Sequence, residues 1–296
     1  MPPVSAALDL VLALVLAPLL PGLVARVKAL FAGRQGQPLV QSYYDLAKLL
    51  RKGAVYSTTT TWIFRAGPIV SLAAVLAALA VVPAAARQSL LSFPGDLVLL
   101  AYLLAVGRFA TVVAALDTGS SFEGMGASRE VHFAALAEPA LLVGLLALSH
   151  QAGSLRLASL LAGTRPLAPE VALVAAAVAI LLLLENCRVP FDDPNTHLEL
   201  TMVHEVMVLD HGGVDFALVL YGACLKLWLW SALLVGVLLP AGLRTLPFVG
   251  VLGVLLVAAG IGVVESTLAR VRLLRVPQLV AAALVLAAVA FILEVR

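Results

Sequence analysis

The chain has 296 residues, of which 62% are hydrophobic and only 12% are charged, and its 19 basic residues nearly balance its 17 acidic ones. A soluble domain is about 45–50% apolar and about 25% charged, so this composition excludes most soluble classes and indicates a membrane protein. The near-neutral charge provides no strongly basic face, so no nucleic-acid partner is expected. The two cysteines, Cys187 and Cys224, are too few for an iron–sulfur cluster or a structural zinc site.

Eight apolar runs are long enough to cross a bilayer as helices. A hydrocarbon core of roughly 30 Å needs about 20 apolar helical residues, because no water is present there to satisfy an open backbone. The first run lacks the basic start of a signal peptide and precedes basic residues, so we expect it to be retained as a membrane helix. The runs cover residues 4–25, 66–86, 95–115, 132–149, 169–187, 214–239, 246–264 and 276–294. We therefore predict an all-α polytopic membrane protein with one integral membrane domain over residues 1–296.

The distribution of Lys and Arg predicts the orientation of the chain. With eight crossings both termini lie on one side, and cytoplasmic loops carry the excess of basic residues. Thirteen of the 19 basic residues lie in or beside the loops at about 26–65, 116–131, 188–213 and 265–275, and five lie in the other set. These four loops are predicted to be cytoplasmic, with both termini on the outer side of the inner (plasma) membrane.

The first of these loops contains the segment PLVQSYYDLAKLLRK at 38–52. Its residues Leu39, Tyr43, Leu46 and Leu50 recur at helical spacing, and polar residues occupy the rest of the helical wheel. The pattern predicts one interfacial amphipathic helix, which either only lies at the headgroups or also docks a soluble partner.

Acidic side chains concentrate around the end of the fifth apolar run. Residues 185–215 contain seven of the 17 acidic residues, and an ionisable group at membrane depth costs roughly 2.5–3.5 kcal/mol on insertion scales. Glu185 follows four consecutive leucines, so it is less compatible with a solvated loop than Asp210 or Asp215. A functional cluster is the first interpretation of this segment, and a solvated loop is the alternative.

A short helix is predicted after this turn. VPFDDPN at 189–195 breaks the preceding helix, and Thr196 with Glu199 three residues later forms a capping-box pattern. The residues that share one face of the new helix, at about 100° per residue, are His197, Thr201, His204 and Glu205. Because imidazole changes charge near neutral pH and burial raises carboxyl pKa values, this face suits a proton relay. A structural histidine pair is the alternative.

Other spans also carry charged residues, namely Arg108, Glu138, Lys226 and Glu265. One hypothesis is a lateral chain of exchangeable protons across the helices. The alternative is helix-end snorkelling for Arg108 and Glu265 and isolated interhelical pairs for the other two. Glu138 and Lys226 favour the first hypothesis, because neither lies near a predicted helix end.

Motifs for metal, phosphate or hydride chemistry are absent from the sequence. His204 and Glu205 do not continue into HExxH, the HLE at 197–199 has no downstream PCxxC, and neither GxGxxG nor GxxxxGK occurs. No cofactor or metal site is therefore expected in this chain.

The stretch ENCRVPFDDPNTHLELTMVHEVMVLDHGG at 185–213 resembles the signature of the complex I subunit 1 family, the eight-helix membrane subunit beside the redox arm. It is most similar to the hydrogenase branch, which includes formate hydrogenlyase subunit 4 and hydrogenase-4 component C, membrane subunits of group 4 nickel–iron (NiFe) hydrogenases. The resemblance extends to RAGPIVSL at 65–72, to the run at 107–142 and to ESTLARVRLLRVPQL at 265–279. It thus covers nearly the whole chain.

The resemblance implies an energy-coupling subunit without a catalytic centre of its own. Such a subunit anchors a soluble arm in the lipid bilayer and joins electron transfer to ion movement, with H⁺ expected and Na⁺ as the alternative. The NiFe centre and the iron–sulfur clusters would lie in partners: hydrogenase large and small subunits, an iron–sulfur protein and, in the membrane, an antiporter-like subunit. The coupling residues carried over by position are Glu138, Glu185, Asp192, Asp193, His197, Glu199, His204 and Glu205. Lys226, which lies inside the sixth run, joins them in the coupling hypothesis. The residues expected at the interface with the redox arm are Arg65, Arg129, Glu130 and Arg188.

Two other functions stay open from the sequence. Quinone-reactive relatives usually carry a Gly-Pro-Asn-Arg element after the first span, and here that place reads AGRQGQPLVQSYYDLAKLL at 32–50. This departure argues against the quinone-site subunit of a respiratory NADH:quinone oxidoreductase. A stand-alone secondary transporter often has repeated halves, and we find no such repeat.

Overall fold

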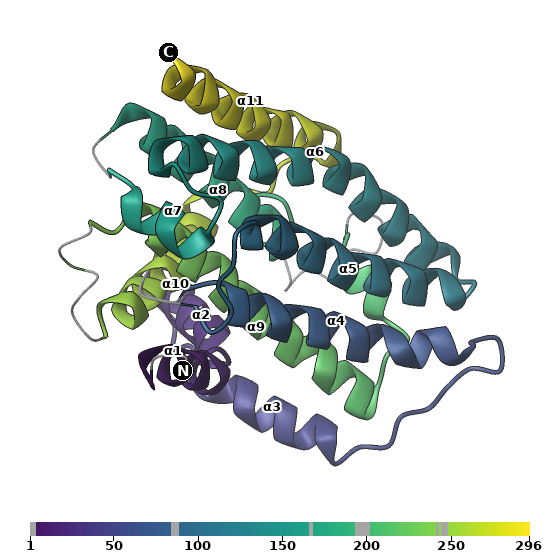
Figure 1. Cartoon of the computed structure of the whole chain (residues 1–296). Coiled ribbons are helices and arrows are strands. Elements are labelled where there is room, and N and C mark those ends of the chain that lie inside the picture. The colour runs from purple at the N-terminus through teal and green to yellow at the C-terminus, as the bar shows by residue number, and fades with distance from the viewer. Residues whose placement is uncertain (1–3, 84–88, 166–167, 193–201, 241–242, 244–247) are drawn as a thin grey trace.

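The computed structural model describes residues 4–83, 89–165, 168–192, 202–240, 243 and 248–296. Within these ranges the regular structure is helical and no strand occurs, which confirms the predicted all-α fold (Figure 1). The α-helices are α1 (Val4–Leu16), α2 (Leu19–Phe31), α3 (Gln41–Leu50), α4 (Trp62–Val81), α5 (Asp96–Asp117), α6 (Ser121–Ala152), α7 (Leu157–Gly163), α8 (Pro169–Glu185), α9 (Gly213–Leu238), α10 (Val249–Thr267) and α11 (Val276–Val295).

Each of the eight apolar runs coincides with a helix or a helix pair. Among the described residues, six helices are long and apolar enough to cross a membrane alone: α4, α5, α6, α9, α10 and α11 with the turn before it. α1 and α2 pass the same test as a pair bent by 53°, and α8, with 17 residues, matches the fifth run. The chain is therefore a multi-pass membrane protein.

The first span is broken at Pro18. A proline has no N–H group, so Pro18 leaves the carbonyl of Leu14 without its helical donor. The hydroxyl of Tyr221 in α9 donates to this carbonyl at 3.0 Å, and the hydroxyl of Tyr43 in α3 donates to the carbonyl of Val15. The backbone at the break is thus partnered inside the protein, as a bilayer requires.

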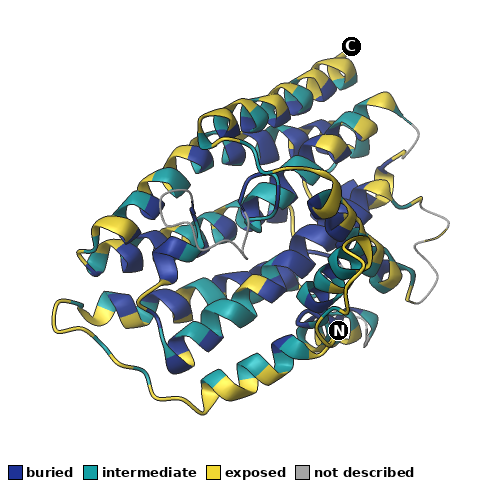
Figure 2. Cartoon of the chain, turned by 180° about the vertical axis from the view of Figure 1, so that it is seen from behind, coloured by how far each residue is buried: buried dark blue, intermediate teal, exposed yellow. Residues whose placement is uncertain are grey.

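α9 lies at the centre of the bundle. In its most apolar stretch 67% of the residues are buried, a larger share than in the other candidate spans. It packs against α4, α8 and α10, and its residues Trp228 and Trp230 are among the largest fully buried side chains. Figure 2 shows that buried residues gather in the interior of the bundle and exposed ones on its outer helices. On the far side of α5, α6 packs against α11 (Figure 1). This arrangement brings four long helices, α5, α6, α8 and α9, around a common interior.

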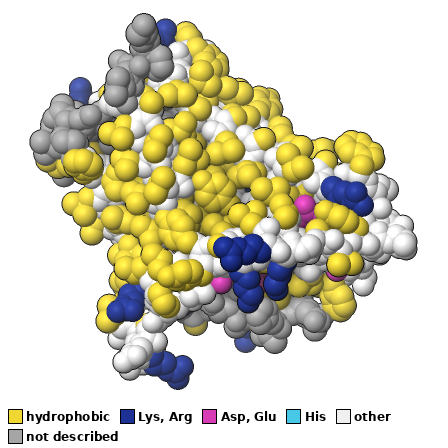
Figure 3. Space-filling view, turned by 90° about the horizontal axis from the view of Figure 1, so that it is seen from below, with side chains coloured by type: hydrophobic (Ala, Val, Ile, Leu, Met, Phe, Trp, Pro, Cys, Tyr) yellow, Lys and Arg dark blue, Asp and Glu magenta, His cyan; other side chains and the backbone are white. Residues whose placement is uncertain are grey.

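The outside of the bundle is apolar. In the face shown in Figure 3 most side chains are hydrophobic and the charged ones gather in a few places. Tyr102, Phe109 and Leu256 are 67%, 69% and 64% exposed. A soluble monomer rarely exposes so much apolar area, so lipid is the surrounding that fits this surface.

The predicted amphipathic helix is present as α3, which packs against α9 and α2. Tyr44 and Leu50 remain 63% and 57% exposed. α3 therefore lies along the bundle and keeps apolar side chains free for the membrane interface.

Four connections lie at one end of the bundle, which we call the polar end; they precede α4, α6, α9 and α11. Hydrogen bonds that join them run from Thr61 N to Asp117 Oδ2 (2.6 Å), from Asp210 N to Glu123 Oε1 (3.2 Å) and from Val271 N to the Pro190 carbonyl (3.0 Å). The four loops that the basic residues grouped together thus share one side of the bundle.

α2 and α10 approach each other closely at Gly262, and the importance of this contact for stability can be tested. A Cβ at Gly262 would lie 2.7 Å from Val27 Cβ and 3.0 Å from the Val24 carbonyl, whereas a Cβ at Gly260 meets nothing within 4 Å. Gly262→Ala is expected to lower the free energy of unfolding by about 1–3 kcal/mol through overpacking. Gly260→Ala, the matched control in the same helix, is expected to be neutral or slightly stabilising. Thermal unfolding in detergent measures both, and equal midpoints would contradict this account of the contact.

Candidate functional site

Arg108 lies inside α5, and its guanidinium contacts three carboxylates. Nε donates to Glu130 Oε1 at 3.1 Å, and the two Nη groups donate to Glu138 and Glu185. The Arg108 side chain is only 7% exposed. A planar guanidinium with five donors suits such multiple pairing better than an ammonium does. One side chain therefore ties α5 to α6 and α8.

Lys226 of α9 approaches Glu185 from a second direction, with Nζ 2.8 Å from Oε2. The Glu185 side chain is 5% exposed and lies between two cations. We call Arg108, Glu130, Glu138, Glu185 and Lys226 the inner cluster. With all groups ionised it has three carboxylates and two cations, so it carries one net negative charge.

A second buried ion cluster lies where α2, α10 and the turn after α8 meet. Lys28 Nζ is 2.8 Å from Glu265 Oε2, and Arg188 Nη1 is 3.5 Å from Glu265 Oε1. The Glu265 side chain is 0% exposed. These three residues form the outer cluster, which carries one net positive charge when all groups are ionised.

The segment after α8 is also tied to the polar end. Asp192 is buried; its Oδ1 pairs with Arg270 at 2.8 Å and its Oδ2 accepts from the backbone N–H of Val203 at 2.9 Å. Arg129 of α6 donates to the Met202 carbonyl at 2.8 Å. Residues 185–192 and 202–203 are therefore held by charged groups from α5, α6, α9 and the α10–α11 connection.

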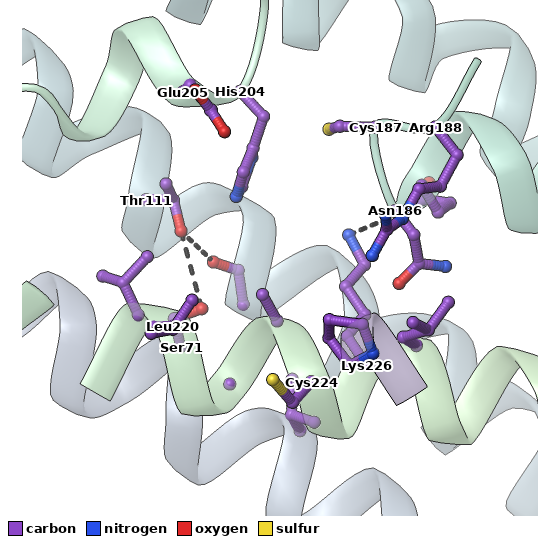
Figure 4. Close-up of a pocket in the computed structure, with 18 of the residues that line it drawn as sticks. Ser71, Thr111, Asn186, Cys187, Arg188, His204, Glu205, Leu220, Cys224 and Lys226 are labelled. Carbon is purple, nitrogen blue, oxygen red and sulfur yellow. Dashed lines mark hydrogen bonds and ion pairs between the residues drawn. The ribbon is translucent and has the colours of Figure 1, made fainter. Parts of the chain in front are cut away.

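A cavity of about 300 Å³ lies between the two ion clusters. Members of both clusters line it, and so do the hydroxyls of Ser71 and Thr111, the thiol of Cys187 and the imidazole of His204 (Figure 4). Leucine and valine side chains from α2, α4, α5 and α9 complete its walls. The walls are thus mixed, with charged, hydroxyl and imidazole groups set among apolar side chains.

His204 and Cys187 lie outside the membrane helices and face this cavity. Burial lowers the pKa of the His204 imidazole, although the nearby carboxylates of Glu130 and Asp192 act in the opposite direction. Burial likewise raises the pKa of the Cys187 thiol well above its ordinary value. At neutral pH the histidine is therefore neutral and can accept a proton, while the thiol stays protonated. Within the described ranges, no three His, Cys, Asp or Glu side chains are grouped so as to hold a metal ion.

The predicted coupling residues fall into three groups. Glu185, His204, Glu205 and Lys226 line the cavity. Glu138 contacts Arg108 beside it, with its own side chain 45% exposed, and Asp192 is held away from it by Arg270. Asp193, His197 and Glu199 lie outside the described residues. Their part in a relay stays a prediction.

The short helix predicted from Thr196 onward does not extend through His204. Residues 196–201 lie outside the described residues, 202–204 are not helical, and Glu205–Val208 form a short 3-10 helix (η2). The prediction of one continuous helical face reaching His204 and Glu205 is therefore wrong. The contacts of Val203 and Met202 with Asp192 and Arg129 supply tertiary partners that replace helical ones.

The four residues expected at the redox-arm interface occupy different surroundings. Arg65 is exposed at the polar end, with its guanidinium 4.0 Å from the ring centre of Tyr56. Arg129 is bonded to the Met202 carbonyl, whereas Glu130 and Arg188 belong to the inner and outer clusters. Arg65 is thus the member most accessible to a partner.

Sequence reasoning missed the central role of Arg108. The snorkelling alternative places Arg108 near a helix end, but Arg108 lies well inside α5, so this alternative does not hold. The same alternative fails for Glu265, whose side chain is inaccessible, and the sequence did not indicate Lys28 as its partner. A signal for Arg108 was available, because the predicted run at 95–115 already continues past this residue.

Comparison with known proteins identifies relatives over nearly the whole chain. The family model described as NADH dehydrogenase matches residues 5–295. Formate hydrogenlyase subunit 4 of Escherichia coli (strain K12) is 33% identical, over 93% of each chain. Hydrogenase-4 component C of the same organism is 33% identical over 95% of this chain and 92% of its own.

The fold also matches a solved structure. A chain of the membrane-bound sulfane sulfur reductase, an archaeal respiratory membrane complex, superposes with a TM-score of 0.82 over 98% of both chains, at 21% sequence identity. The helical arrangement described above is therefore an established fold.

The inner cluster makes a prediction about stability. Lys226→Met removes one partner of a buried carboxylate and is expected to lower the free energy of unfolding by about 3–5 kcal/mol. In the double variant with Glu185→Gln the loss should be smaller than the sum of the single losses, by about 0.5–3 kcal/mol. Lys48→Met on the exposed face of α3 is the control. Thermal unfolding is measured for wild type, the two single variants and the double variant. Additive losses of stability would contradict a direct ion pair between Lys226 and Glu185.

Proposed function

Because this chain belongs to the NADH dehydrogenase family, we propose that it is the membrane-anchoring, energy-coupling subunit of a membrane-bound NiFe hydrogenase complex of the formate hydrogenlyase type. The observation that carries the proposal is the inner cluster, in which buried ion pairs join four helices next to the polar end. The identity of 33% to two hydrogenase subunits supports this branch of the family.

The proposed division of labour is the one that the family resemblance of the sequence implies. Redox centres would lie in partner subunits: hydrogenase large and small subunits with the NiFe centre, and an iron–sulfur protein with further clusters. An antiporter-like subunit would lie beside this chain in the membrane. The polar end would face the cytoplasm and the redox arm, and both termini would lie on the outer side of the inner membrane.

The coupling step follows from the charge of the inner cluster. A carboxylate paired with both Arg108 and Lys226 binds a proton weakly. Uptake at Glu185 therefore requires that a cation withdraw or that negative charge come near. A shift of residues 185–192 when the redox arm changes its charge would provide this change, because the segment carries Glu185 and Asp192 and is held by ion pairs. Glu138 and Lys226 would then transmit this change of charge to the membrane interior.

Quinone binding is a second candidate function, favoured by the cavity of about 300 Å³ and by a relative named as part of a quinone-linked enzyme. This relative is an NADH-quinone oxidoreductase chain from Anaplasma phagocytophilum (strain HZ), which is 28% identical over 67% of the present chain and 62% of its own. The altered element at 32–50 argues against quinone binding. A quinone in a solvent extract of the purified complex, together with sensitivity to quinone-site inhibitors, would favour this candidate over the first.

The proposed partners predict what co-purifies with the chain. After gentle solubilisation, the preparation should contain a nickel–iron large subunit and should evolve hydrogen from a reduced viologen. Mass spectrometry and a metal assay identify the bound subunits. A chain that purifies alone and moves a solute in liposomes without any redox partner would contradict the proposal and favour a secondary transporter.

The proposed coupling role predicts the effect of neutralising the carboxylates. In membrane vesicles that hold the complete complex, Glu185→Gln is expected to abolish proton movement per hydrogen formed, and Glu138→Gln to reduce it. Hydrogen evolution from reduced viologen should persist in both, because the redox centres lie in other subunits. Acidification and hydrogen are measured on the same vesicles.

Glu170→Gln is the matched control, since Glu170 lies at the opposite end of α8 and contacts Gln151 at 3.3 Å. It should leave both measurements unchanged. If Glu185→Gln and Glu138→Gln also leave both unchanged, neither residue takes part in coupling.

A further inference from the structure

The outer cluster has no part in the proposed coupling step, yet it shares the cavity with the inner cluster. The two clusters have opposite net charge when fully ionised, because one has an excess carboxylate and the other an excess cation. They are joined through the chain as well: Glu185 ends α8, and Arg188 follows three residues later. A movement of this one turn would change both clusters together.

The groups around the cavity favour water inside it. A cavity of about 300 Å³ has room for several water molecules, and water enters a buried space when it finds two to four polar partners there. The hydroxyls of Ser71 and Thr111 lie 3.5 Å apart on its wall (Figure 4). Among the described residues, Arg188 Nε is buried with no protein acceptor, so a water is the partner that this N–H group would find.

One side of the cavity reaches the surface at the outer cluster. Gln37 lines the cavity and is exposed, and the Lys28 side chain is 27% exposed. The side chains of the inner cluster that line the cavity are at most 20% exposed. Glu138, which is 45% exposed, belongs to this cluster but does not line the cavity. The outer cluster therefore stands between the accessible side of the cavity and the inner cluster.

Glu265 is the one carboxylate of the outer cluster, and both of its oxygens pair with cations at the cavity wall. A buried carboxylate in this setting is either a fixed counter-ion or a group that exchanges protons when a cation moves. Arg188 is the cation whose movement is linked to Glu185, since it lies in the turn that follows α8. Lys28, by contrast, is held on α2.

We propose that the cavity is a hydrated proton path and that Glu265 is the proton-carrying carboxylate at its outer side. A hydrated proton from the accessible side of the cavity binds Glu265 Oε1 when Arg188 withdraws, and the O–H bond breaks again when the proton passes to cavity water. Proton exchange along the water then delivers one proton to Glu185 and restores the Glu265 carboxylate. The cavity water is regenerated, so the net result is the transfer of one proton from the solvent to Glu185. This inference rests on the proposed function, because the driving movement of 185–188 comes from the redox arm.

The test uses the complete complex in membrane vesicles. Glu265→Gln is expected to lower proton movement per hydrogen formed to the level of Glu185→Gln, while hydrogen evolution from reduced viologen persists. Glu265→Asp should restore part of the proton movement. Glu294→Gln in the last turn of α11, away from the cavity lining, is the matched control and should change nothing.

A second variant separates proton exchange from a purely structural ion pair. Glu265→Gln alone raises the net charge of the outer cluster from plus one to plus two, because Lys28 and Arg188 both remain. Adding Lys28→Met returns this charge to plus one, with Arg188 as the remaining cation, so the fold should recover. If Glu265 carries protons, this double variant stays uncoupled. Infrared difference spectra between oxidised and reduced complex add a direct readout, since the band of a protonated carboxyl group should be present in wild type and missing in Glu265→Gln.

The outcomes distinguish a failure of the role proposed for Glu265 from a failure of the proposed function. Normal proton movement in Glu265→Gln, or its recovery in the double variant, would overturn the role of Glu265 while the loss in Glu185→Gln still supports the proposed function. Normal proton movement in both Glu265→Gln and Glu185→Gln would contradict both the role of Glu265 and the proposed coupling function. A quinone bound in the cavity would also overturn the hydrated path, because it would occupy the space between the clusters.

Discussion

The pairing of Arg108 with three carboxylates is the interaction on which the interior of this protein depends. A charge inside a lipid-embedded bundle is stable only when opposite charges and hydrogen bonds compensate its lost hydration. Arg108 meets this condition by drawing side chains from α6 and α8 to α5, and Lys226 completes it from α9. The apolar outer surface could be built from many sequences. The positions of these four helices relative to one another are specified by the buried charges.

The need to pair buried polar groups also explains how the break at Pro18 is tolerated. The freed carbonyls of Leu14 and Val15 would be costly against lipid, and hydroxyls from Tyr221 and Tyr43 satisfy them. The first span can therefore bend by 53° without exposing its backbone. Because α2 begins after this bend, Lys28 reaches the side of Glu265 and contributes to the outer cluster. A local proline thus helps to place a charged group two turns later along α2.

The sequence predicted the helices well and their charge pairing poorly, for a physical reason. Length and apolarity determine which runs cross a bilayer, and these are local properties. Arg108 and Glu185 are 77 residues apart, and nothing local indicates that α5 and α8 bring them together. The capping pattern at Thr196 and Glu199 was likewise a local signal, whereas residues 202–204 follow tertiary contacts with Asp192 and Arg129. Family resemblance pointed to residues 185–213, and the structure places Glu185, His204 and Glu205 of this segment at the cavity.

The two clusters also bear on what the turn after α8 can do. An isolated buried ion pair resists movement, since separating it leaves two unpaired charges. Here the turn carries a carboxylate at Glu185 and a cation at Arg188, so a displacement changes the inner and outer clusters at the same time. If Arg188 leaves Glu265, Lys28 still balances one carboxylate in the outer cluster. If Glu185 shifts, Arg108 keeps two other carboxylates. Arg108 and Glu265 therefore each retain a partner when the turn moves, which lowers the cost of moving it and makes residues 185–188 a suitable element for coupling the polar end to the membrane interior.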